Sequence, residues 1–359
     1  MKLKTESSIS GLLCLALLGA IASFPRTLAL ASTIPEPLSQ LSDSALEQAQ
    51  EPNPLFLVQQ NGLYGYMAST GKLVIEPKFD VASSFSQGLA VVVINNKFGY
   101  IDSLGKMIVQ PQFDWAYRFS EGRAEVGIGG KSGYIDTQGN VVVSPQFEDA
   151  SEFSNGLAAV KLNGKWGYID TSGSVVIKPQ FDKALRFSVS EGRSTGIGLA
   201  AVLINGKWGY INQSGKMTIP PQFNQVGTFS QELAAVQIGN QWGYIDNSGK
   251  VIISPQFEKA LNFSNGFAGV QIGNQWGYID TSGMKVISSQ FEQVGNFSEG
   301  LALIVIGGKY GYINESGSIV VEPKFDQAFD FNNGLATVQI ADRYGYINTQ
   351  GDYVWTPTN

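Results

Sequence analysis

A Gly-Tyr pair recurs through the chain at a nearly constant interval, and this recurrence constrains the fold more than any other feature. The glycines of the pairs are Gly65, Gly99, Gly133, Gly167, Gly209, Gly243, Gly277, Gly311 and Gly345. Successive pairs lie 34 residues apart, except for one interval of 42. The sequence after residue 53 therefore consists of nine copies of one unit, with a single eight-residue insertion.

Each copy contains three short segments of strand-forming residues separated by turn residues. In the fourth copy they are residues 157–162, 165–170 and 174–177, rich in Val, Ile, Tyr and Trp. Asn163-Gly164 between the first two is typical of a two-residue hairpin. A helical repeat of the same length would contain few internal glycines. The pattern predicts an all-β chain of antiparallel three-stranded units.

We expect the nine units to stack end to end, each burying its aromatic side chains against the next. The first and last units are both whole, so no blade can be built from strands of both chain ends to close a ring. This favours an open, solenoid-like array, and a closed β-propeller is the alternative. A proline follows the third segment in eight copies, and we expect it to end the pairing of that strand because it has no N–H to donate.

The sequence before the repeats divides into two parts. Residues 1–31 combine a basic start, a short apolar run and small residues before the expected cleavage site, which predicts a secretory signal peptide. Residues 32–53, rich in Pro, Ser and Gln, predict a disordered linker. The repeat domain then occupies residues 54–359, with its insertion near 189–197. We predict an exported protein, periplasmic or extracellular, with no transmembrane span after cleavage of the signal.

Composition removes several classes of function. The chain has no histidine and one cysteine, Cys14, which lies inside the predicted signal. A Ser-His-Asp triad, a Cys-His pair and a histidine-ligated zinc site are therefore excluded. The formal net charge of −6 argues against a nucleic-acid partner, which requires a basic surface. We predict a protein that is not an enzyme and that holds no cofactor or metal.

Two acidic columns repeat through the copies. The first starts the turn after the Gly-Tyr strand, as at Asp102, and alternates between Asp and Asn, which fits a side chain that accepts backbone N–H groups. The second follows a phenylalanine, as at Asp114. A calcium site requires several carboxylates at tight loop spacing. A glycosidase requires only two acids, but an active site is normally singular, whereas these acids are repeated.

The glycine of each Gly-Tyr pair stands inside a strand, where glycine is unfavourable unless another group approaches closely. We therefore expect an aromatic ring or a neighbouring backbone to pack over it. The position before this glycine is aromatic in eight copies and is interrupted by Ser132, which favours a solvent-reachable position there.

The candidate binding surface consists of the tryptophans before glycine and two charged residues of the insertion. Aromatic rings at a repeated position can form the core between copies or an exposed platform on which sugar rings stack. Insertions in repeat scaffolds often carry binding residues. The candidates are Trp166, Trp208, Trp242, Trp276, Glu191 and Arg193.

The hexapeptide Lys-Trp-Gly-Tyr-Ile-Asp at residues 165–170, with near copies at 207–212, 241–246 and 275–280, resembles the WG-containing repeat family of bacterial proteins. The resemblance extends to the glycine after the turn, to the Pro-Gln-Phe-Asp/Glu segment and to the Phe-Ser-x-Gly-Leu-Ala run. It implies an all-β repeat protein, often secreted or associated with the cell envelope. It implies no general enzymatic activity and no defined site.

The absence of a unique catalytic constellation leads to one main functional hypothesis. We expect a non-enzymatic binding or scaffold protein that presents a repeat surface to a protein or glycan of the cell envelope. Two alternatives remain. One is a carbohydrate-active hydrolase that uses a pair of acidic residues near the insertion, and the other is a purely structural surface component.

Overall fold

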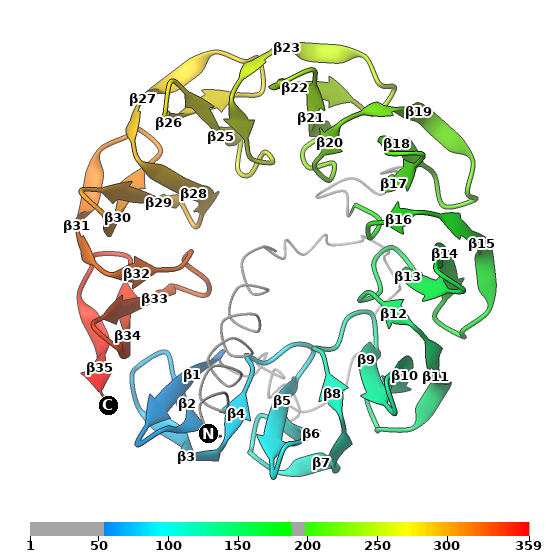
Figure 1. Ribbon diagram of the computed structural model, residues 1–359. Helices are drawn as coiled ribbons and strands as arrows, with labels where there is room; N and C mark the ends of the chain where they lie inside the picture. The colour runs from blue at the N-terminus through cyan, green and yellow to red at the C-terminus, as the bar shows by residue number, and fades with distance from the viewer. Residues whose placement is uncertain (1–53, 189–197, 359) are drawn as a thin grey trace, which may run out of the picture.

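The computed structural model describes residues 54–188 and 198–358, and these residues form nine antiparallel sheets arranged as the blades of a closed ring (Figure 1). The predicted signal peptide and linker, and the insertion near 189–197, lie outside the described residues. The first sheet has three strands and each of the other eight has four. The architecture is a nine-bladed β-propeller, so the all-β prediction is confirmed and the favoured open array is wrong.

Within a blade, the strands run outward from the channel at the centre of the ring in sequence order. The inner strands are β4 (Val81–Ala82), β8 (Trp115–Ala116), β12 (Asp149–Ala150), β16 (Lys183–Ala184), β20 (Gln225–Val226), β24 (Lys259–Ala260), β28 (Gln293–Ser298) and β32 (Gln327–Ala328). The second strands are β1 (Leu55–Gln60), β5 (Leu89–Ile94), β9 (Arg123–Ile128), β13 (Leu157–Leu162), β17 (Ala200–Ile204), β21 (Leu233–Ile238), β25 (Phe267–Ile272), β29 (Leu301–Ile306) and β33 (Leu335–Ile340).

The Gly-Tyr pair lies on the third strand of each blade, and the fourth strand forms the outer rim. The third strands are β2 (Leu63–Ala68), β6 (Lys97–Asp102), β10 (Lys131–Asp136), β14 (Lys165–Asp170), β18 (Lys207–Ile211), β22 (Gln241–Asp246), β26 (Gln275–Asp280), β30 (Lys309–Asn314) and β34 (Arg343–Asn348). The outer strands are β3 (Leu73–Phe79), β7 (Met107–Phe113), β11 (Val141–Phe147), β15 (Val175–Phe181), β19 (Met217–Phe223), β23 (Val251–Phe257), β27 (Lys285–Phe291), β31 (Ile319–Phe325) and β35 (Tyr353–Thr358).

The blades therefore have one strand more than the three predicted for each copy. The additional inner strand spans only two residues in seven of the eight blades that contain it, and it lies in the phenylalanine-bearing segment between copies. Two residues are too few to show an alternating pattern in the sequence. Backbone bonds extend the pairing beyond the strand itself, for example from the Ser83 N–H to the Val91 carbonyl at 2.9 Å.

The proline that was expected to end the pairing of the third segment lies inside the outer strand instead. Pro111 is within β7, whose pairing with β6 shifts register between the pairs Phe98–Phe113 and Tyr100–Val109. The outer strand is an edge strand with a bulge at this point, which is where a sheet tolerates proline. The prediction that the strand ends there is wrong.

The same bulge explains the invariant glycine before each tyrosine. A Cβ placed on Gly99 would lie 2.5 Å from the carbonyl oxygen of Val109 and 2.8 Å from the nitrogen of Pro111. The outer strand thus crosses directly over the glycine, and no larger residue fits there. The prediction of a neighbouring backbone packed over this glycine is confirmed.

Neighbouring blades are joined by the tyrosine of the Gly-Tyr pair. The Tyr100 ring packs against Phe119 of the next blade, with ring centroids 5.0 Å apart. Its hydroxyl donates to the Tyr117 carbonyl at 2.8 Å. The ring contact and the hydroxyl–carbonyl hydrogen bond recur at the other eight interfaces, always between the tyrosine of one blade and the following blade. Each tyrosine is thus buried with its polar atom satisfied.

The ring closes where the last blade meets the first, beside the channel (Figure 1). The described part of the first blade has no inner strand, so it lacks the phenylalanine that packs on the tyrosine elsewhere. Phe56 of β1 takes its place, with its ring centroid 5.6 Å from that of Tyr346. The Tyr346 hydroxyl donates to the Leu57 carbonyl at 2.7 Å.

Phe56 is the residue that adapts the first copy to this closing contact. The equivalent position on the second strand is a buried alanine in every other blade. These residues are Ala90, Ala124, Ala158, Ala200, Ala234, Ala268, Ala302 and Ala336. A larger side chain on β1 thus fills the space that an inner-strand phenylalanine fills at the other interfaces.

No helix within residues 54–188 and 198–358 has the length and apolar character needed to cross a membrane.

The Phe56→Ala substitution is expected to destabilise the closing interface by about 3 kcal/mol, because it removes a buried ring and leaves a cavity. No peptide bond joins the first and last blades directly. The ring should therefore open there first, and amide hydrogen exchange should accelerate in β1 and β34 before it does in β14. Hydrogen-exchange mass spectrometry measures this order.

Phe153→Ala is the matched control, because it removes the equivalent ring between two blades that the chain connects. It should lower stability similarly without selective exchange in β1 and β34. Unchanged exchange in β1 and β34 of the Phe56→Ala protein would show that closure does not depend on this ring.

Candidate functional site

The acidic column that follows the phenylalanine supports the hairpin turns, and at Asp114 it also joins neighbouring blades. Asp114 accepts from the Lys97 ammonium at 2.6 Å and from the Gly129 N–H at 2.7 Å. The hydrogen bond from Lys97, and next that from Gly129, hold the pKa of Asp114 below its usual range. The other acids that accept N–H groups of the hairpin turn in this way are Asp80, Glu148, Asp182, Glu258, Glu292 and Asp326.

The first acidic column has the turn role that its Asp/Asn alternation predicts. The Asp102 Oδ1 atom accepts from the N–H groups of Leu104 and Lys106 at 3.0 and 2.9 Å. The same bonds form at Asp136, Asp170, Asn212, Asp246, Asp280, Asn314 and Asn348. Among the residues that the structure describes, no group of three or more Cys, Asp or Glu side chains is arranged to hold a metal ion.

The four candidate tryptophans lie between blades. Trp166, Trp208 and Trp242 are partly buried and pack against the apolar clusters of their interfaces. Trp276 is the most buried of the four, with 9% of its surface exposed. The rings therefore contribute mainly to the packing between blades. Glu191 and Arg193, the two candidates in the insertion, lie outside the described residues.

Ser132, which interrupts the aromatic position, is buried rather than solvent-reachable. The indole of Trp115, on the inner strand of the same blade, lies directly over Gly127. In this blade the large aromatic side chain is therefore on the inner strand, as Trp115, and not at the position of Ser132 on the third strand. The Ser132 hydroxyl donates to Glu125 Oε1 at 2.6 Å, so the carboxylate and the serine fill the interior of this blade together.

Glu125 is a buried carboxyl group at a position that is small or apolar in most other blades. Its pKa is raised to about 7, chiefly by burial and to a smaller extent by the neighbouring Asp149, against the lowering effect of hydrogen bonds from Ser132 and Trp115. The group is 6% exposed, so it is not positioned to reach a substrate.

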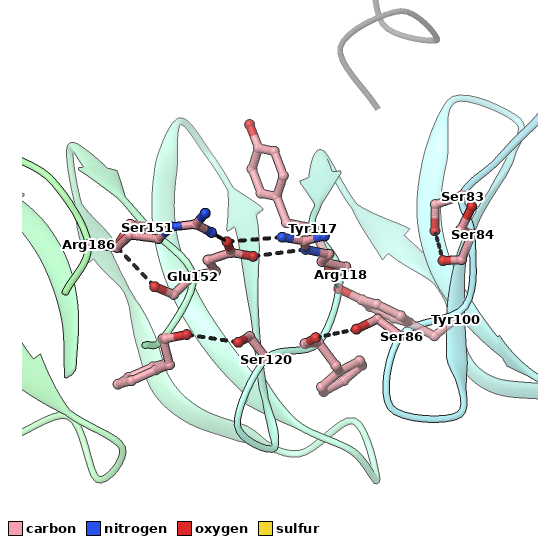
Figure 2. Close-up of polar contacts among 12 residues, drawn as sticks. Ser83, Ser84, Ser86, Tyr100, Tyr117, Arg118, Ser120, Ser151, Glu152 and Arg186 are labelled. Carbon is pink, nitrogen blue, oxygen red and sulfur yellow. Dashed lines mark hydrogen bonds and ion pairs between the residues drawn. The ribbon is translucent and has the colours of Figure 1, made fainter. Parts of the chain in front are cut away.

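Three charged side chains connect the third, fourth and fifth blades at the channel wall (Figure 2). Arg118 holds Glu152 through two hydrogen bonds, from Nε at 2.9 Å and from Nη2 at 3.0 Å. Arg186 of the next blade binds the same carboxylate. Burial alone would raise the pKa of Glu152, but the two guanidinium groups outweigh it and lower the pKa. We call these three residues the arginine bridge.

The arginine bridge belongs to a position that varies through the ring. The residue before the inter-blade phenylalanine is partly buried in all eight blades that contain it. These residues are Ser84, Arg118, Glu152, Arg186, Thr228, Asn262, Asn296 and Asp330. The position varies around the whole ring, and the third, fourth and fifth blades are distinguished because their charged residues pair with one another there.

Tyr117 adds an exposed aromatic ring beside the arginine bridge. It precedes Arg118, and 51% of its surface is exposed. Figure 2 shows its ring pointing away from the blade, while Arg118 turns toward Glu152. Its position holds serine in the second and fourth blades, at Ser83 and Ser151. Sequence analysis missed Tyr117 and the arginine bridge, although comparing the nine copies position by position would have revealed them.

The sequence matches the model of the WG containing repeat in eight consecutive copies. They span residues 64–98, 98–131, 133–166, 166–208, 208–242, 242–276, 276–310 and 310–344. The chain belongs to the WG containing repeat family. No curated protein matches the chain.

Several solved structures resemble the propeller at low sequence identity. A eukaryotic initiation factor has a TM-score of 0.52 at 13% identity, over 77% of this chain and 89% of that chain. The dihydro-heme d1 dehydrogenase NirN has a TM-score of 0.45 at 14% identity, over 85% of this chain and 82% of that chain. Virginiamycin B lyase from Staphylococcus aureus has a TM-score of 0.38 at 15% identity, over 63% of this chain and 90% of that chain. The first of these similarities shows the fold alone.

The Glu125→Gln substitution is expected to change how stability depends on pH. The pKa of about 7 in the folded chain lies above that of an unfolded glutamate, so the folded state binds the proton more tightly. This contribution to stability is complete below pH 4 and is lost as the pH rises through 7. Glutamine cannot ionise and can still accept from Ser132.

Thermal unfolding of both proteins between pH 4 and pH 8 measures the effect. The wild type should lose up to about 3 kcal/mol more stability over this range than the variant. Asp330, whose pKa burial raises to about 6, is unchanged in both proteins. Parallel stability profiles would contradict the assignment.

Proposed function

We propose that the protein is an exported, non-enzymatic binding protein that holds a protein or glycan of the cell envelope along its channel wall. The observation that carries the proposal is the location of the residues that break the repeat. The framework positions are nearly constant, whereas Tyr117, Arg118, Glu152 and Arg186 differ from their equivalents and gather on adjacent blades.

The arginine bridge is suited to recognition because it is pre-organised. Arg118 and Arg186 remain about one-third exposed while Glu152 fixes their direction. Two guanidinium groups and one carboxylate leave a net positive charge beside an exposed tyrosine ring. Such a surface can bind carboxylate or hydroxyl groups and stack against a ring at little cost in side-chain entropy.

The proposal of a function without catalysis is supported by the roles of the repeated acids. Both acidic columns accept backbone hydrogen bonds in turns. The hydrolase alternative would require acids near Glu191, outside the described residues. Export is proposed from the signal-peptide pattern of residues 1–31.

The repeat itself supplies a substitution that tests the binding surface. Changing Tyr117→Ser and Arg118→Ser together installs the residues of the second blade, Ser83 and Ser84. We expect the fold to persist and affinity for the envelope partner to fall at least 10-fold, because the ring and one guanidinium are lost. Quantitative pull-down and glycan-array binding of the wild type and the variant measure this loss.

Val175→Thr is the control for this experiment. Val175 is exposed on the outer strand β15, far from the channel in Figure 1. This variant should bind as the wild type does. A folded wild type that binds no envelope protein or glycan, or a double variant that binds equally well, would overturn the proposal.

A further inference from the structure

A cavity of about 400 Å³ opens between the seventh and eighth blades, at the channel wall. Its lining comes from the inner strands β24 and β28 with the residues that flank them, from Gln271 of β25 and from Trp276 of β26. Leu261 and Val294, which also line it, pack over Gly269. A Cβ on Gly269 would lie only 2.7 Å from Val294 and 3.0 Å from Leu261. The absence of a side chain at Gly269 thus lets these two residues form one apolar wall.

The polar side chains of the cavity are available to a ligand. Gln271 and Gln293 line it, and neither amide forms a side-chain hydrogen bond with another residue that the structure describes. Lys259 adds an exposed ammonium group without an ion pair among those residues. The carboxylate of Glu292 is already engaged, since it accepts from the N–H groups of Gly307 and Gly308 at 2.6 and 3.0 Å.

We propose that this cavity is a subsite for one sugar ring of a glycan, which narrows the ligand class of the proposed binding function and rests on it. Each glutamine amide both donates and accepts, as a sugar hydroxyl does. Trp276, Leu261 and Val294 supply an apolar surface against which the C–H groups of the ring can pack. The volume lies within the range of small-molecule sites.

The composition of the cavity favours a sugar over a phosphate or a purely apolar ligand. A phosphate is disfavoured because the Glu292 carboxylate lines the cavity and would repel a dianion, while Lys259 supplies a single positive charge. A purely apolar ligand would cover the two amides without offering them hydrogen-bond partners, which costs free energy. Lys259 can in addition bind the carboxylate of an acidic sugar, so neutral and acidic glycans are distinguished by the test.

The test replaces the two amides with residues that the repeat already accepts. Valine stands at the position of Gln271 in other blades, as at Val93 and Val305, and Val81 stands at that of Gln293. The double variant Gln271→Val with Gln293→Val should therefore fold. Its control is Gln237→Val with Gln225→Val, the same register in the sixth blade, outside the cavity.

Isothermal titration calorimetry with chitohexaose, cellohexaose and hexagalacturonate compares the wild type with the two double variants. We expect the wild type to bind at least one of them, and the Gln271→Val with Gln293→Val protein to bind it at least 10-fold more weakly. The control should match the wild type. Preference for hexagalacturonate that Lys259→Gln abolishes would support an acidic sugar, and insensitivity to Lys259→Gln would support a neutral one.

Two results would overturn the inference. One is that none of the three glycans binds, and the other is that both double variants bind as the wild type does. Neither result bears on the partner that the Tyr117 and Arg118 substitutions probe. Loss of partner binding in that experiment together with no glycan binding here would remove only the sugar subsite.

Discussion

The contact between a buried tyrosine and the next blade is the interaction on which the whole ring depends. At each interface the tyrosine ring packs on a phenylalanine, and its hydroxyl donates to a backbone carbonyl of the neighbouring blade, as for Tyr168 and Leu185 at 2.7 Å. A buried hydroxyl without a partner would be costly, so the bond fixes the distance and the register between blades. Nine equivalent contacts of one kind make nine similar blades into one body.

Closing the ring requires one copy that differs from the rest. In the first blade Phe56 replaces the alanine found at this position elsewhere, and the Leu57 carbonyl accepts the Tyr346 hydroxyl. Whole units at both ends of the sequence indicated an open array, because many propellers close through one blade that combines strands from both chain ends. This chain closes through a side chain instead. The sequence shows phenylalanine at position 56 where the other copies have alanine, but its role in closure depends on packing against Tyr346 of the last copy.

The repeat, the hairpins, the turn-forming acids and the crowded glycine could all be predicted, because each depends on contacts within one unit. The inner strand and the closure could not, since two-residue strands have no periodicity and closure depends on the angle between blades. The tryptophans were chosen for chemistry, yet a repeated aromatic such as Trp166 has a repeated structural role. Tyr117 was missed because exposure on the channel wall is not evident from strand patterns.

The variation between copies separates the framework of this chain from the surface that can recognise a ligand. Positions that form the tyrosine contact or the bulge over glycine cannot change without damaging an interface. Each inner strand pairs with only one other strand of its sheet, so the side chains along its open edge are freer to differ. The arginine bridge uses this freedom across three blades. A ligand held there would contact several blades at once, so its binding would also stabilise the packing between them.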